Sequence, residues 1–121
     1  MIPSPPWTLV YADGSANVYR FEATDAGVRF VYEPMTQERS SSGMYSGGDP
    51  VDVQLALDDP RIAPLWPQVR ALEADTAHHA TERSKGDGAV TITGDGATRT
   101  FLVVRAATRE LEAWLAALRA T

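Results

Sequence analysis

The chain has 121 residues, of which 44% are hydrophobic and 22% are charged, a composition typical of one globular domain spanning residues 1–121. Its formal net charge of −5 argues against binding to duplex nucleic acid or to anionic membranes, because both rely on clustered Lys and Arg. There is no cysteine, so disulfides and thiolate metal sites are excluded.

Three segments near the N-terminus have large apolar or aromatic residues at alternate positions, as half-buried strands do. We expect strands over residues 7–12, 18–23 and 28–33, each with aromatic residues on one face. Turn-forming residues separate them at 13–15 and 24–27. Short strands joined by tight turns indicate an antiparallel meander.

The longest predicted loop spans residues 35–50 and has an unusual composition. Between Arg39 and Gly48 it contains four Ser and three Gly, with Met44 and Tyr45 among them. Such a segment buries little apolar area, so core packing does not explain it. Loops longer than about a dozen residues are uncommon in compact domains and often carry function.

A fourth strand is expected over residues 51–57, followed by a helix from about residue 65 to residue 80. The buried stripe of that helix would consist of Leu65, Val69 and Leu72. A polar connection over residues 81–88 comes next.

A β-hairpin and a helix are expected to complete the chain. The hairpin turns at residues 94–96, and the final helix begins at Thr108. Its apolar residues have the i, i+3, i+4, i+7 spacing of a buried helix face, and they are Leu111, Trp114, Leu115 and Leu118. The sequence therefore predicts an α+β fold of order β-β-β-β-α-β-β-α, in which a meander and a C-terminal hairpin form an antiparallel sheet with two helices packed on one face.

The leading functional hypothesis is a non-catalytic binding module whose polar loops contact an anionic small ligand or a protein partner. Backbone N–H groups of a Gly-rich turn and Ser hydroxyls can surround an anion, and Arg39 adds a charge-assisted donor. Residues 83–88 form a second Gly-rich loop with two cations, and the two loops together would make a basic pocket on an acidic protein. The predicted ligand-binding residues are Arg39, Ser40, Ser41, Ser42, Gly43, Tyr45, Ser46, Gly47, Arg83 and Lys85. A self-hydrogen-bonded Ω-loop is the alternative without a ligand.

A small hydrolase is a second hypothesis. A loop Ser, or Tyr45, would act as nucleophile with His78 or His79 as its base, because the order of such groups along a chain is not fixed. The Gly-x-Ser-x-Gly nucleophile motif is absent around Ser46.

The histidine pair is expected near the C-terminal end of the first helix. There Asp75 and His79 lie four residues apart, as do His78 and Glu82, so each imidazole would face a carboxylate. Adjacent helical residues project about 100° apart, so both imidazoles cannot reach one ion. We expect no metal site and no cofactor.

A third hypothesis is an acidic protein–protein interaction module, such as a toxin-neutralising protein. It predicts an exposed apolar patch containing Trp66 or Met44. Formation of a homodimer through such a patch is a further alternative.

Ten of the eleven basic residues are Arg, which suggests a GC-rich bacterial genome. The N-terminus lacks the pattern of a signal peptide and no apolar run could span a bilayer, so we expect a cytoplasmic protein without membrane contact.

Overall fold

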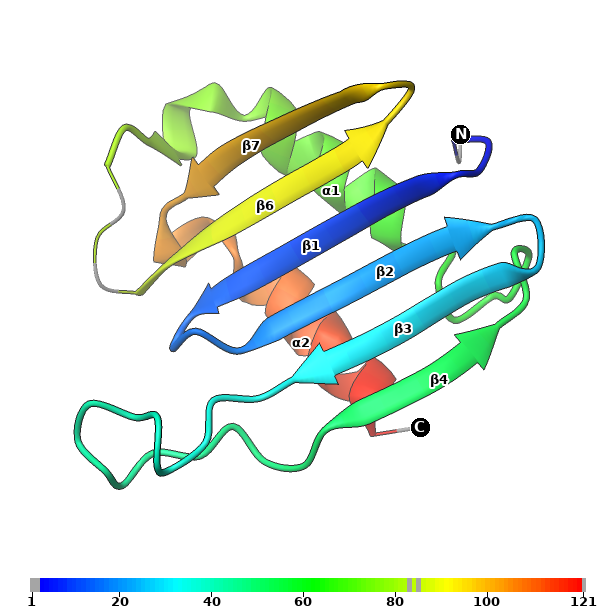
Figure 1. Cartoon of the computed structure of the whole chain (residues 1–121). Coiled ribbons are helices and arrows are strands. Elements are labelled where there is room, and N and C mark those ends of the chain that lie inside the picture. The colour runs from blue at the N-terminus through cyan, green and yellow to red at the C-terminus, as the bar shows by residue number, and fades with distance from the viewer. Residues whose placement is uncertain (1–2, 83, 85, 121) are drawn as a thin grey trace.

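The structure is a computed structural model that describes residues 3–82, 84 and 86–120. Seven strands form one antiparallel sheet in the order β4-β3-β2-β1-β6-β7-β5, and two helices lie on one of its faces (Figure 1). This arrangement confirms the predicted α+β fold. The strands are β1 (Trp7–Gly14), β2 (Val18–Thr24), β3 (Gly27–Glu33), β4 (Val51–Leu55), β5 (His79–Ala80), β6 (Gly86–Gly94) and β7 (Ala97–Val103), and the helices are α1 (Leu65–Ala74) and α2 (Arg109–Arg119). Two short 3-10 turns cover Thr76–His78 and Arg105–Ala107.

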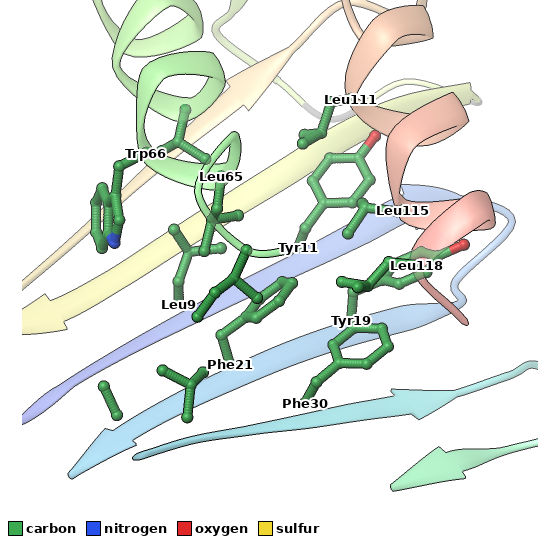
Figure 2. Close-up of a cluster of buried hydrophobic side chains, with 14 of the residues drawn as sticks. Leu9, Tyr11, Tyr19, Phe21, Phe30, Leu65, Trp66, Leu111, Leu115 and Leu118 are labelled. Atoms are coloured by element: carbon green, nitrogen blue, oxygen red, sulfur yellow. The ribbon is translucent and has the colours of Figure 1, made fainter. Parts of the chain in front are cut away.

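Alternate residues of β1, β2, β3 and β6 point toward the helices and form most of the sheet's share of the core. Figure 2 shows the side chains of β1, β2 and β3 beneath leucines of the two helices. Phe21 and Phe30 lie opposite each other on β2 and β3 and are fully buried. Trp7 and Trp66 meet edge to face with ring centroids 5.0 Å apart, which closes the core between β1 and α1.

Tight turns fix the register of the sheet. The β6–β7 hairpin turns through Asp95 and Gly96 with φ angles of 51° and 74°, the left-handed values that a two-residue type I′ turn requires. At the far end of β1, Gly14 pairs with Gly86 so closely that a Cβ on Gly14 would lie 2.4 Å from the Gly86 Cα.

Several predicted boundaries were wrong. β6 begins at Gly86, inside the connection expected over residues 81–88, and β1 continues to Gly14, past the end expected at residue 12. The strand expected to reach residue 57 ends at Leu55. The first helix ends at Ala74 rather than near residue 80, because Asp75 leaves the helical region with φ −83° and ψ 67°. His79 then pairs with Val103 at the edge of the sheet. The apolar stripe of the helix has faded by this point, so pairing with β7 replaces further helical turns.

Candidate functional site

The 35–50 loop joins β3 to β4 and is closed at its neck. The Gly47 amide donates to the Met35 carbonyl at 2.9 Å. The Gly47 carbonyl accepts the Tyr32 hydroxyl at 2.6 Å and the Arg119 Nη1 at 3.2 Å. The Arg119 guanidinium also lies 4.5 Å from the centre of the Tyr32 ring, as a cation–π contact. These contacts anchor the loop to the core and to the end of α2.

Asn17, immediately before β2, ties the 35–50 loop to the turn between β1 and β2. Its side chain is only 3% exposed. The Nδ2 donates to Asp13 Oδ2 at 2.9 Å and to the Tyr45 hydroxyl at 2.7 Å. Its Oδ1 accepts the Met35 amide at 2.8 Å. The Asn17 side-chain amide therefore holds Met35 and Tyr45 of the loop against the β1–β2 turn.

Many polar groups of the loop are used in its own turns. The Ser40 and Ser42 hydroxyls are hydrogen-bonded to each other at 3.1 Å, and Ser42 Oγ also accepts the Met44 amide at 3.2 Å. Ser46 Oγ accepts the Gly48 amide at 3.2 Å. The loop thus forms many of its hydrogen bonds within itself, as an Ω-loop does, and these bonds give it a defined conformation.

A groove of about 770 Å³ lies between this loop and the β1–β2 turn. Five of the predicted ligand-binding residues line it, namely Arg39, Ser40, Ser41, Ser42 and Tyr45. The opposite wall comes from Gly14, Ser15 and Ala16, with Met35 between the two walls. Gly43, Ser46 and Gly47 belong to the same loop but do not line the groove, and Arg83 and Lys85 lie outside the described residues.

Arg39 is the cation of this groove. Within the part of the chain that the structure describes, no carboxylate lies within 4.0 Å of its guanidinium. Arg20, Arg29 and Arg61, by contrast, are each paired with an acidic side chain. Arg39 is therefore available to an external anion.

A second hollow, of about 140 Å³, lies on the other side of the β1–β2 turn. It is lined by Asp13, Gly14, Ser15, Gly86, Arg105 and Glu112. Gly14 and Ser15 line both spaces, so the turn separates them. Figure 1 shows the 35–50 loop and the start of β6 at the same end of the sheet. Among the described residues of the predicted second loop, Gly86 lines the hollow and none lines the groove.

Tyr11 contacts Glu112, one of the residues that line this hollow. Its hydroxyl donates to Glu112 Oε2. Burial raises the pKa of Tyr11 well above its usual value, and the hydrogen bond and the negative charge of Glu112 raise that pKa further. A Cβ on Gly88 would lie 2.6 Å from the Tyr11 hydroxyl oxygen, so only glycine leaves room for the phenol. Tyr11 is thus a neutral hydrogen-bond donor and orients the carboxylate.

The histidines lie apart from the groove. The His79 Nε2 donates to the Leu72 carbonyl at 2.8 Å, and its ring stacks on Phe101. His78 Nδ1 lies 2.6 Å from Asp75 Oδ2, so its carboxylate partner is Asp75 and not Glu82 as a continuous helix would give. β5, which contains His79, is at the opposite edge of the sheet from β4. No hydrogen bond between an imidazole and a loop hydroxyl is present among the described residues, so the nucleophile–base pair of the hydrolase hypothesis is not formed there.

The sequence did not point to two residues of this region. Asn17 looks like an ordinary turn residue, and its partners Met35 and Tyr45 are distant in sequence, so no local pattern identifies its role. Arg105 could have been found. The hairpin register that pairs Gly88 with Val103, continued by two residues, places Arg105 beside Gly86.

Comparison of the chain with models of protein families, with curated proteins and with solved structures gave no significant match. In the described part of the chain, no helix has the length and apolar character needed to cross a bilayer. The same residues contain no cluster of three or more His, Asp or Glu side chains suited to a metal ion.

Proposed function

We propose that this protein is a non-catalytic binding module whose groove receives an anionic group, either of a small molecule or at the surface of a protein partner. The observation that carries the proposal is the Arg39 guanidinium, which lines a groove of about 770 Å³ and forms no ion pair with a described residue. A guanidinium presents donors in a planar fork that matches carboxylate and phosphate oxygens.

The way in which the loop is held supports the same function. Both walls of the groove are joined through the buried Asn17 side chain, which contacts Met35 and Tyr45. A loop that is ordered before binding loses less conformational entropy when a ligand arrives. On a chain with a net charge of −5, Arg39 also places a local positive charge beside the groove.

We infer the cellular compartment and the class of partner from the composition of the chain. The absence of cysteine supports a reducing compartment, and we propose the cytoplasm of a bacterium. The acidic charge supports ligands and proteins as partners over nucleic acids and anionic membranes.

Thermal denaturation with inorganic phosphate, ATP or citrate tests the proposal. An anion present at 100 times its dissociation constant should stabilise the protein by about 2.7 kcal/mol. Arg39→Gln should remove that gain while leaving the melting temperature without ligand unchanged, because the Arg39 side chain is exposed and makes no ion pair with the described residues.

Arg109→Gln is the matched control, since Arg109 is also exposed and lies at the start of α2, outside the residues that line the groove. Equal stabilisation of both variants would assign the anion effect to general charge screening and would contradict the proposal. If none of the three anions stabilises the wild-type protein or either variant, the proposal is contradicted as well.

A further inference from the structure

The outer edge of β4 has the properties of an unprotected sheet edge. β4 is the first strand in the sheet order, and it pairs with β3 on one side only (Figure 1). Its pairing with β3 runs from Val51 to Leu55 without a register shift. An edge of this kind presents backbone N–H and C=O groups that can pair with another strand.

The opposite edge of the sheet is protected by two devices. β5 covers the end of β7 by pairing with Leu102 and Val103. Further along β7, Arg99 lies opposite the buried Ile92 and therefore on the helix side of the sheet, where it forms an ion pair with Glu73 at 2.6 Å. Short edge strands and inward-pointing charges are common protections against strand pairing. β4 is itself only five residues long, but its helix-side residues Val51, Val53 and Leu55 are all apolar and the segment contains no Pro, Gly or Lys.

The helix side of β4 is also incompletely covered. Val53 lies opposite Phe30 in the register, yet Phe30 is fully buried whereas Val53 is 36% exposed. The other large hydrophobic side chains that are exposed among the described residues are Met44 and Tyr45, in the loop that leads into this strand. The exposed large hydrophobic residues of the described chain therefore all fall within residues 44–53.

The sequence of β4 is complementary to itself in antiparallel pairing. With Val53 opposite Val53 of a second copy, Val51 lies opposite Leu55 and Asp52 lies opposite Gln54. Apolar residues then meet on the helix side, and no two like charges are directly opposed on the other side. The Asp52 carboxylate is already neutralised by Arg29, which donates to it at 3.0 and 2.6 Å.

We propose that β4 pairs with β4 of a second copy across a two-fold axis at Val53, which continues the sheet from one protomer into the next. A two-fold pairing of this kind uses the same patch on both protomers and closes on itself, so it ends at a dimer. No residue of β4 lines the groove at Arg39, so each proposal can fail without the other.

A single cysteine tests the pairing, because the natural chain contains none. Directly opposed residues in an antiparallel pair have Cα atoms about 4.5–5.5 Å apart, which lies within the range of a disulfide. Val53→Cys should therefore form a covalent dimer rapidly under mild oxidation. Thr98→Cys, an exposed position at the protected β7 edge, is the matched control and should form one slowly.

Sedimentation of the wild-type chain gives an independent measurement. A concentration-dependent dimer is expected, and Val53→Lys should convert it to a monomer with an unchanged circular dichroism spectrum, because Val53 is partly exposed in the single chain. A wild-type chain that stays monomeric at its highest soluble concentration, with Val53→Cys no faster than Thr98→Cys, would overturn the proposal. If Val53→Lys does not fold, the cysteine comparison and wild-type sedimentation still decide the question.

Discussion

The Asn17 side-chain amide donates a hydrogen bond of 2.7 Å to the Tyr45 hydroxyl and so joins two segments that are 28 residues apart in the chain. The same buried side chain accepts the Met35 amide, at the other end of the loop. The shape of the groove at Arg39 depends on this connection, because the β1–β2 turn forms one wall and the 35–50 loop forms the other.

Asn17→Ala should destabilise the protein by about 2 kcal/mol, since it removes the acceptor of the Met35 amide and one donor to the Asp13 carboxylate at a nearly enclosed side chain. Urea denaturation measures the loss. Ser15→Ala, in the same turn but exposed, should change stability by less than about 0.5 kcal/mol. Similar losses in the two variants would contradict the central role of Asn17.

Tyr45→Phe should loosen the loop while leaving the core intact. It removes one hydrogen bond to Asn17 from a ring that is already 39% exposed, so the loss of stability should be about 1 kcal/mol or less. Hydrogen exchange of the 35–50 amides should accelerate, and exchange in β1 should not. Combined with Asn17→Ala, the second change should add little, because the two residues share one interaction.

The protein should lose stability as the pH rises above about 10. Burial raises the pKa of both Tyr11 and Tyr19 in the folded state above the ordinary value of 10.0. Between the unfolded and folded pKa values the unfolded chain releases these protons and the folded chain retains them, so the free energy of unfolding falls by up to about 1.4 kcal/mol per pH unit for each tyrosine.

Urea midpoints measured from pH 8 upward test this dependence. Tyr11→Phe should lower stability at neutral pH, because Glu112 loses its donor, and should make the decline at high pH less steep. An unchanged slope in Tyr11→Phe would show that Tyr11 does not contribute to the alkaline transition.

Gly14→Ala should be poorly tolerated because the added methyl group would lie 2.4 Å from the Gly86 Cα, a backbone atom that cannot move aside without separating β1 from β6. We expect a loss of about 1–3 kcal/mol. Gly94→Ala is the matched control at the other end of the same strand pair, where the nearest atom is the Trp7 Cβ at 3.5 Å. Thermal denaturation should show a clearly lower melting temperature for Gly14→Ala than for Gly94→Ala.

The fold was largely predictable because local signals agree with the tertiary structure. Large apolar side chains recur at every second position of the first three strands, as Leu9, Tyr11, Phe21 and Phe30 show, and all four are buried on the same side of the sheet. The end of α1 could not be found in this way. Asp75 leaves the helix where β5 pairs with β7, and that pairing joins residues 24 positions apart in the case of His79 and Val103.

The groove was predictable only in part. Composition singled out the segment with Arg39 and Tyr45, and both residues line the groove. The opposite wall, at Gly14 and Ser15, carries an ordinary turn sequence, and its position against the loop depends on the long-range contacts of Asn17.

Two-dimensional ¹⁵N–¹H NMR during titration with phosphate, ATP and citrate tests the central claim most directly, because it locates binding as well as detecting it. Amide signals of residues 13–17 and 35–50 should shift saturably with at least one of these anions. These shifts should be lost in Arg39→Gln but not in Arg109→Gln. Shifts confined to other surfaces, or unchanged shifts in Arg39→Gln, would contradict an anion site in this groove.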